Sequence, residues 1–484
     1  MTLSKPKQWE PLAAIPILAG LYWLLAGFDG GWLYWSLVHL GPGALMLMSG
    51  MALLLMPGDL RITEYMAAGG LLGALLLLPV MIVCGFGDAL LAGMGAVAAY
   101  LTSGHVALAR EPSSEGAPPA EASWWLDAKT ALDEALLAYF VGTARLPDGD
   151  DIVRLGADAR RIEELMQARG WLDKPEEFHA APAAPDRVYV QQARVYGWAY
   201  ERVSYPSAFM PDAELPGAGL WAQHQSNRQA VAWVMRHPGP PRPWLTCLHG
   251  YRMGEPWMDF LLFPPRWLHE RLGLNLFMPV LPLHGPRRVG MRSGDQYLDG
   301  NPLDLLYAQA QALWDLRRGL AWLRSQEDKP RVGVLGYSLG GYSASVLAQH
   351  DDKLDFVVAG IPPSDLAAAL WRHLPPAHRD YFVEHGLGRE RYQRVLQPVS
   401  PLALPPKVER DRLYLFAGTA DRLVLPDQAL ALARHWGVPV QWYQGAHLTF
   451  RSEPVVRQHI EAAMQRAGWP VSAQLGQAPQ EDWG

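Results

Sequence analysis

An apolar run that ends in Gly-Tyr-Ser-Leu-Gly constrains the fold of this chain more than any other feature. Residues 332–337 form a strand-like run that ends at Tyr337, and a helix-like run of small residues follows Ser338. The glycines on either side, Gly336 and Gly340, allow the chain to reverse where a Cβ atom would clash. The spacing predicts a sharp strand-to-helix turn that holds the serine above a sheet. The following helix would point its N-terminus at negative charge developing there.

Short β-like runs alternate with helical runs from residue 186 onward. The predicted strands lie at 188–205, 229–235, 244–248, 274–279, 331–335, 355–359, 413–417 and 438–443, and the predicted helices lie at 302–326, 339–349 and 428–436. This alternation predicts an α/β fold with a mostly parallel sheet covered by helices on both faces. The strand pattern lapses at 361–410, where we expect a lid; the alternative is a surface loop with a helix.

Two further predicted strands end beside polar residues that complete a catalytic set. Asp421 and His447 each follow a strand-like run and a turn of small residues. A serine hydroxyl becomes a good nucleophile when a base accepts its proton and an acid orients that base. The chain order Ser338, Asp421, His447 predicts nucleophile, acid and base. Asp365, after the strand at 355–359, is the alternative acid.

Backbone N–H groups are expected to bind the negative charge that develops on the substrate. One is the amide of Leu339, directly after the serine. The other is the amide of Tyr251, in the loop after the strand at 244–248. In that loop Gly250 allows close approach of the main chain, and we expect His249 to serve the loop geometry.

A second His-Gly pair opens a basic segment that is a candidate wall of the substrate pocket. His284, Arg287 and Arg288 follow the fourth predicted strand. With Arg292, the arginines are candidates to hold an anionic group of a substrate. The alternative is that they are solvated or pair with Asp295.

Ionisable side chains almost vanish between residues 11 and 109. Four apolar runs, at 11–28, 32–56, 65–84 and 89–109, are each near the length that crosses a bilayer as a helix. Polar residues at 102–105 interrupt the fourth run. We predict a multi-span transmembrane region at 1–110.

The basic residues beside these runs predict an orientation. Lys5 and Lys7 precede the first run, Arg61 lies between the second and third, and Arg110 follows the fourth. The other two connections contain no Lys or Arg. Because basic flanks stay on the cytoplasmic side, four spans predict that the N-terminus and the C-terminal catalytic part both face the cytoplasm.

A linker and two helices join this region to the rest of the chain. Residues 111–123 are rich in Pro, Ser, Glu, Ala and Gly, and apolar residues recur at helical spacing in 124–144 and 151–171. We expect the two helices to pack as a hairpin within 111–185. The catalytic domain then occupies 186–484.

Charge and cysteine content narrow the classes of function. The formal net charge of −6 gives no electrostatic case for nucleic-acid binding. Cys84 and Cys247 each sit in an apolar run, which indicates buried free thiols instead of a disulfide or a metal site. We expect no metal and no cofactor.

Residues 188–467 resemble the α/β-hydrolase superfamily. The matching motifs are His249-Gly250, Gly336-Tyr337-Ser338-Leu339-Gly340-Gly341, Ala417-Gly418-Thr419-Ala420-Asp421 and Gly445-Ala446-His447. The resemblance implies an eight-stranded sheet and a serine hydrolase that cleaves carboxylic esters through an acyl-enzyme. The fold hosts many substrates; beside a bilayer, we expect a lipid or another apolar acyl ester. The alternatives are acyl transfer to an acceptor other than water and a catalytically silent membrane scaffold.

Overall fold

The structure is a computed structural model that describes residues 11–56, 59 and 61–469, and the chain divides into two compact units. The helical unit contains residues up to Ala144 together with Gly418–Pro426 and Trp442–Phe450. The sheet unit contains Arg145–Ala417, Asp427–Gln441 and the residues from Arg451 onward. The helical unit therefore includes two short loops from the C-terminal half of the chain.

The strands form one sheet in the order β1-β2-β3-β5-β4-β6-β7-β8-β9. Their bounds are β1 Tyr189–Val195, β2 Trp198–Pro206, β3 Gln229–Met235, β4 Trp244–Leu248, β5 Asn275–Val280, β6 Val332–Tyr337, β7 Phe356–Gly360, β8 Leu413–Gly418 and β9 Gln441–Tyr443. The pairings from β1 to β3 and on to β5 are antiparallel, and those from β5 through β4, β6 and β7 to β8 are parallel. The predicted α/β fold with a mostly parallel sheet is confirmed.

The sheet has nine strands where the sequence predicted eight. The segment 188–205 is a hairpin, in which Val195 pairs with Trp198 across a two-residue turn. Both turn residues, Tyr196 and Gly197, have positive φ angles, as the tightest hairpin turns require. The alternation of Val and Tyr continues on both sides of the turn. For this reason the segment was predicted as one strand instead of two.

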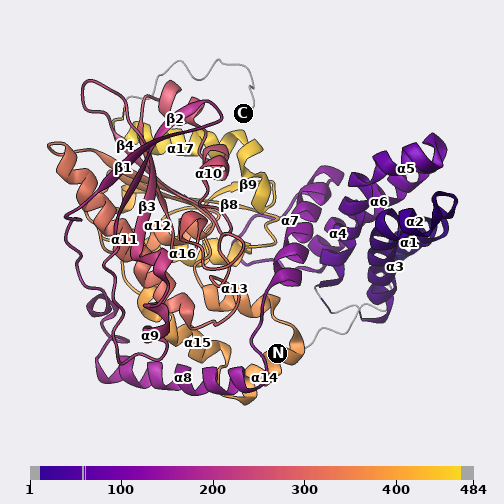
Figure 1. The fold of residues 1–484 in the computed structure, drawn as a ribbon, viewed down its shortest axis with the longest axis horizontal. Helices are drawn as coiled ribbons and strands as arrows, with labels where there is room; N and C mark the ends of the chain where they lie inside the picture. Colours follow the sequence, from indigo (N-terminus) through magenta and orange to yellow (C-terminus); the bar gives the residue numbers. More distant parts are fainter. Residues whose placement is uncertain (1–10, 57–58, 60, 470–484) are drawn as a thin grey trace. The chain divides into compact units, whose positions relative to one another are not determined.

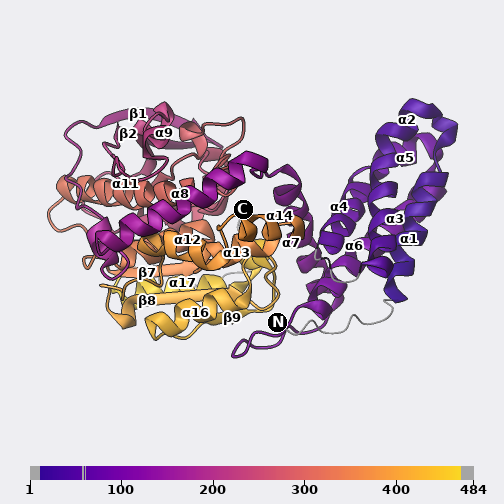
Figure 2. The same ribbon diagram turned by 90° about the horizontal axis from the view of Figure 1, so that it is seen from below.

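The central strands of the sheet are buried along their whole length. Every residue of β4, β5, β6, β7 and β8 is buried, as expected for strands covered on both faces. Helix α12 (Leu339–Ala348) packs against β4, β6 and β7, and α11 (Asp304–Gln326) lies beside it (Figure 2). Helix α17 (Pro454–Arg466) packs against β7. The shorter helices include α9 Ala218–Trp221, α10 Pro256–Leu262 and α16 Pro426–Trp436.

The segment between β7 and β8 is a helical insertion. It contains α13 (Leu366–His373), α14 (Pro376–Glu384) and α15 (Arg389–Val395). Helices α14 and α15 both pack against α8 (Gly149–Ala168). The action of the segment 361–410 as a lid stays a prediction.

The apolar N-terminal runs are helical in the described residues (Figure 1). The helices are α1 Ala14–Leu25, α2 Gly31–Val38, α3 Leu40–Leu55, α4 Arg61–Leu75, α5 Leu77–Cys84 and α6 Phe86–Arg110. By length and composition α6 can cross a bilayer; the pairs α2–α3 and α4–α5 are bent by 50° and 51°, and each would add one crossing if counted as a single span. The helix at 11–25 is shorter than a span. Four crossings stay a prediction.

Helix α6 continues through the polar residues that were expected to interrupt it. The hydroxyl of Thr102 donates to the carbonyl of Ala98 at 2.8 Å, and that of Ser103 donates to the carbonyl of Tyr100 at 2.6 Å. The helix itself thus satisfies both hydroxyls, so the expected interruption was wrong. Gly104 permits the close approach of α7 (Trp124–Thr143), because an added Cβ would overlap the carbonyl oxygen of Asp127.

The two helices expected to form a hairpin pack on different partners. Helix α7 packs against α4 and α6, and it belongs to the helical unit. Helix α8 packs against α14 and α15, and it belongs to the sheet unit. The boundary between the units falls between Ala144 and Arg145.

Replacement of Gly104 by Ala tests the α6–α7 contact. We expect Gly104→Ala to lower the free energy of unfolding by about 1–3 kcal/mol, because the new Cβ pushes the two helices apart. Gly142→Ala in α7 is the matched control, since nothing lies within 4 Å of its added Cβ. Thermal unfolding of the full chain in detergent measures the stability of both variants. Equal melting temperatures for the two variants would contradict the packing.

Candidate active site

Ser338 lies at the turn between β6 and α12 with φ 55° and ψ −118°. A positive φ is strained for a residue with a Cβ, and such strain concentrates at functional positions. The amide of Ser338 donates to the carbonyl of Gly360 at 2.9 Å, which ties the turn to β7. A Cβ at Gly340 would overlap the carbonyl oxygen of Leu248, and one at Gly336 would overlap that of Gly340. Steric exclusion therefore requires both predicted glycines.

The loop after β4 approaches the serine. An added Cβ at Gly250 would lie 3.7 Å from the Cβ of Ser338. Tyr251 is the next residue of this loop, and Leu339 is the first residue of α12, where the N–H has no partner within the helix. The structure thus places the predicted oxyanion segments beside the serine turn. Their action as donors stays a prediction.

His249 is buried inside this loop. Its Nδ1 lies 2.8 Å from the carbonyl of Gly250, and its Nε2 lies 3.1 Å from the amide of Leu281. The amide can only donate, so Nε2 accepts and Nδ1 carries the proton. Burial lowers the pKa of His249 to about 4, so the ring is neutral. This geometry fits the expected role in loop shape.

Asp421 and His447 lie together in the helical unit. Nδ1 of His447 is 2.7 Å from Oδ2 of Asp421, and both side chains are buried. Oδ1 of Asp421 accepts from the amides of Leu423 and Val424 at 3.0 and 2.8 Å, which fixes the carboxylate. The alternative acid, Asp365, instead caps α13 by accepting from the amide of Ala368. The structure therefore pairs His447 with Asp421.

Opposing effects set the pKa of His447. Burial lowers it, because the charged imidazolium loses hydration. The carboxylate of Asp421, through its charge and its hydrogen bond, and the charge of Asp133 oppose burial and leave the pKa above the ordinary value.

The basic segment after β5 does not form the expected anion-binding wall. Arg287 is 1% exposed, and its guanidinium pairs with Asp315 at 2.6 Å and donates to the carbonyl of Val280. The prediction that Arg287 holds a substrate anion is wrong, because a buried, paired guanidinium is part of the core. Arg288 pairs with Glu255 at 3.0 Å.

The remaining predicted member of the pocket wall, His284, is buried. Its Nδ1 lies 2.8 Å from the carbonyl of Pro282, and its ring packs against those of His249 and Tyr297. Burial holds its pKa well below the ordinary value. Both observations place His284 in the packing beneath the oxyanion loop.

The predicted catalytic residues are divided between the two units. Ser338 and the oxyanion loop belong to the sheet unit, whereas Asp421 and His447 belong to the helical unit. The acid–base pair and the serine turn are each formed in the structure. The meeting of His447 with Ser338 stays a prediction.

Two buried acidic residues in α7 were not predicted to take part in the site, because this segment was expected only to pack. Asp133 and Glu134 are 0% and 1% exposed, and they contact the loops that carry Asp421 and His447. The sequence did contain a signal for this contact, because Asp133 and Glu134 are adjacent acids within a run of apolar residues. Carboxylates are rarely buried without a partner, so such a pair predicts a polar contact.

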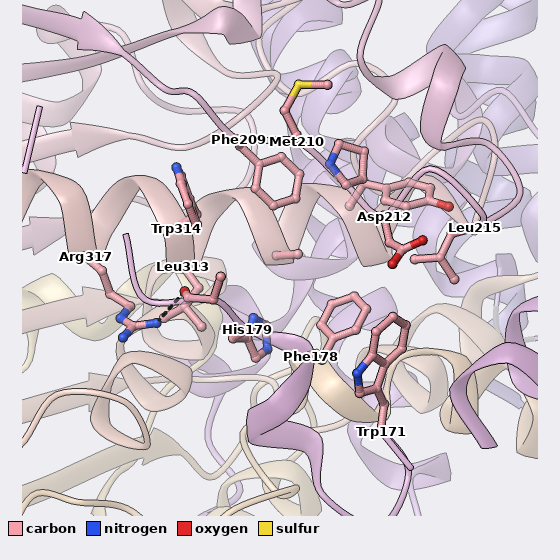
Figure 3. Close-up of a pocket in the computed structure, with 14 residues that line it drawn as sticks. Trp171, Phe178, His179, Phe209, Met210, Asp212, Leu215, Leu313, Trp314 and Arg317 are labelled. Carbon is pink, nitrogen blue, oxygen red and sulfur yellow. Dashed lines mark hydrogen bonds between the residues drawn. The ribbon is translucent and has the colours of Figure 1, made fainter. Parts of the chain in front are cut away.

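A cavity of about 230 Å³ lies elsewhere in the sheet unit (Figure 3). Aromatic rings from Trp171, Phe178, Phe209 and Trp314 line it, with Arg317 at one end. None of the predicted site residues is among its lining residues. In the described part of the chain, no cluster of three or more His, Cys, Asp or Glu could hold a metal ion.

Part of this chain matches a known family model, and most of the length of two relatives aligns with it. Residues 310–451 match the model described as the prolyl oligopeptidase family. Two proteins of Mycobacterium tuberculosis, MT2702 and Rv2627c, are 38% and 37% identical over 342 residues, which cover 66% of this chain and 81% of each relative.

Two acetyl xylan esterases are among the solved structures that match part of this chain. The enzyme from a Paenibacillus species is 17% identical with a TM-score of 0.42, covering 68% of this chain and 98% of its own. The enzyme from a Thermoanaerobacterium species is 16% identical with the same TM-score, covering 69% and 96%.

Replacement of Asp421 by Asn tests the electrostatics of the pair. We expect the pKa of His447 to fall in Asp421→Asn, because burial is then opposed by one fewer negative charge. Histidine NMR titration, with the resonance assigned by its loss in His447→Gln, measures the change. Asp365→Asn is the matched control and leaves the titration where it was. An unchanged pKa in Asp421→Asn would contradict the proposed pairing.

Proposed function

For this chain, which belongs to the family of MT2702 and Rv2627c, we propose the function of a serine hydrolase. The proposed enzyme cleaves a carboxylic ester through an acyl-enzyme on Ser338. The strained backbone of Ser338 between β6 and α12 carries this proposal. The match of residues 310–451 to the prolyl oligopeptidase model and the buried pair Asp421–His447 support it. The catalytic cycle needs no cofactor.

In the proposed mechanism, Oγ of Ser338 attacks the acyl carbon while Nε2 of His447 takes its proton. Asp421 holds the tautomer in which Nδ1 carries a proton and Nε2 can accept one. The amides of Tyr251 and Leu339 donate to the oxyanion. His447 then passes the proton to the leaving alcohol. Water attacks the acyl-enzyme with the same base, and the acid is released.

We further propose that the N-terminal helices lie in a bilayer and that the catalytic part faces the cytoplasm. Large apolar side chains on these helices are open to the surroundings: Leu25 and Leu55 are each 74% exposed, and Trp32 and Phe86 each 72%. A dense set of such side chains fits contact with lipid better than contact with water. The basic residues that flank the apolar runs support this orientation.

The bilayer also suggests the class of substrate. The loops that carry Asp421 and His447 belong to the same unit as the apolar helices. We propose an apolar acyl ester, such as a lipid ester, as the substrate. Peptide amides are the alternative that the prolyl oligopeptidase match suggests.

Labelling with a fluorophosphonate tests the nucleophile. We expect the wild-type chain to be labelled and to hydrolyse p-nitrophenyl esters, with longer acyl chains preferred over acetate. We expect Ser338→Ala to lose both the labelling and the ester hydrolysis, because the substitution removes the hydroxyl from the strained turn. Ser343→Ala is the matched control: Ser343 is buried in the same helix and bonds only to the carbonyl of Leu339. Faster cleavage of p-nitroanilides than of p-nitrophenyl esters would favour the peptidase alternative. If the folded wild-type protein is not labelled, the assignment of Ser338 as the nucleophile is wrong.

Extraction and reporter fusions test the membrane proposal. We expect the full chain to stay with the membrane pellet at alkaline pH, because its exposed apolar helices are solvated by lipid. A C-terminal reporter that matures in the cytoplasm should be active, and one that requires export should be inactive. Release into the supernatant would contradict membrane insertion, and the opposite reporter pattern would contradict the orientation.

A further inference from the structure

The carboxylate of Asp133 in α7 holds the backbones of both loops that carry the proposed acid and base. Oδ2 accepts from the amide of Arg422 at 3.1 Å and from the amide of His447 at 2.7 Å. Oδ1 accepts from the amide of Leu448 at 3.1 Å. We propose that Asp133 is a positioning residue that sets the geometry of the Asp421–His447 pair. This inference rests on the proposed serine hydrolase function.

A single oxygen atom connects two loops that are far apart in sequence. Arg422 directly follows Asp421, so Oδ2 of Asp133 binds the amide beside the acid and the amide of the base itself. A shift of this oxygen would move both loops. Hydrogen bonds to a buried carboxylate are strengthened by its charge, and the bond from the amide of His447, at 2.7 Å, is the shortest of the three.

The side chain of Arg422 provides a second attachment to the same helix. Its Nε donates to Glu134 at 2.7 Å, and its Nη1 pairs with Glu111. Glu134 also accepts from the hydroxyl of Thr63 in α4 at 2.6 Å. Helices α4 and α7 and the segment after α6 thus anchor the residue that follows Asp421.

The position of Asp133 gives it an electrostatic effect that a purely structural residue lacks. Burial and the negative charge of Asp421 raise the pKa of Asp133 to about 7, and the charge of His447 and the amides of Arg422 and His447 oppose this rise. The charged groups that face His447 are Asp421 and Asp133, and both favour its protonated form. Removal of either charge therefore shifts the protonation of the base.

The asparagine substitution separates positioning from folding. In Asp133→Asn one oxygen becomes an NH2 group, which cannot accept, so either the amide of Leu448 or the amides of Arg422 and His447 lose their acceptor. We expect kcat for ester hydrolysis and the rate of fluorophosphonate labelling to fall about a hundredfold, with KM nearly unchanged, because the base is displaced from its productive geometry. We also expect the acidic limb of the pH profile of kcat/KM to move to lower pH, because the imidazolium loses a neighbouring negative charge.

Asp127→Asn is the matched control, since it removes the same charge from the same helix. Asp127 pairs with His105 at 3.4 Å, on the side of α7 that faces α6. We expect this variant to keep the wild-type kcat and pH profile. Asp133→Ala, which removes the charge and both acceptor oxygens without adding a donor group, is measured in parallel and carries the test if Asp133→Asn folds poorly.

All variants are assayed as full-length protein and normalised to the folded fraction. A wild-type kcat and acidic limb in the Asp133 variants would overturn the inference. So would a loss of activity that only follows the loss of folded protein, with the acidic limb unmoved. If the wild-type chain itself is neither labelled nor active, the proposed function fails; if the wild type is active and the Asp133 variants match it, only this inference fails.

Discussion

The hydrogen bond between Nδ1 of His447 and Oδ2 of Asp421 is the interaction on which the proposed chemistry depends. An imidazole that has lost its hydration is a poor site for positive charge unless a carboxylate compensates. Burial also strengthens the compensating interaction, because little water screens it. The same contact fixes the tautomer, so that Nε2 is the nitrogen able to accept a proton. Orientation and basicity therefore come from a single contact.

The acid–base pair depends in turn on the helical unit. Asp133 and Glu134 lie in α7, which packs against α4 and α6, and the loops that carry Asp421 and His447 belong to this unit. Without α7, three backbone amides would lose their acceptor and the buried guanidinium of Arg422 would lose one of its two carboxylate partners, and such losses are costly in a buried site. The helical unit therefore supplies side chains that support the proposed catalytic pair.

Much of the sheet and one half of the site followed from local patterns in the sequence. The buried strands read as continuous apolar runs, and the spacing of Gly336, Ser338 and Gly340 predicted the sharp turn at the serine. The errors arose where partners distant in the chain decide the outcome. Arg287 was assigned to a pocket because its basic neighbours suggested an anion, whereas Asp315 holds it in the core. The polar interruption expected in α6 failed because the helix's own carbonyls accept from Thr102 and Ser103.

Local patterns were enough to predict the alternation of strands and helices, the sharp turn at the serine and the candidate base, but they left Asp421 and Asp365 as candidate acids. These depend on periodicity and on the sterics of neighbouring residues, which a linear pattern records. Only the tertiary structure decided that His447 pairs with Asp421 instead of Asp365, and that Asp133, 314 positions away, binds the backbone of His447. Such contacts form when distant segments are buried together. Their energies depend on desolvation and geometry, which no local pattern encodes.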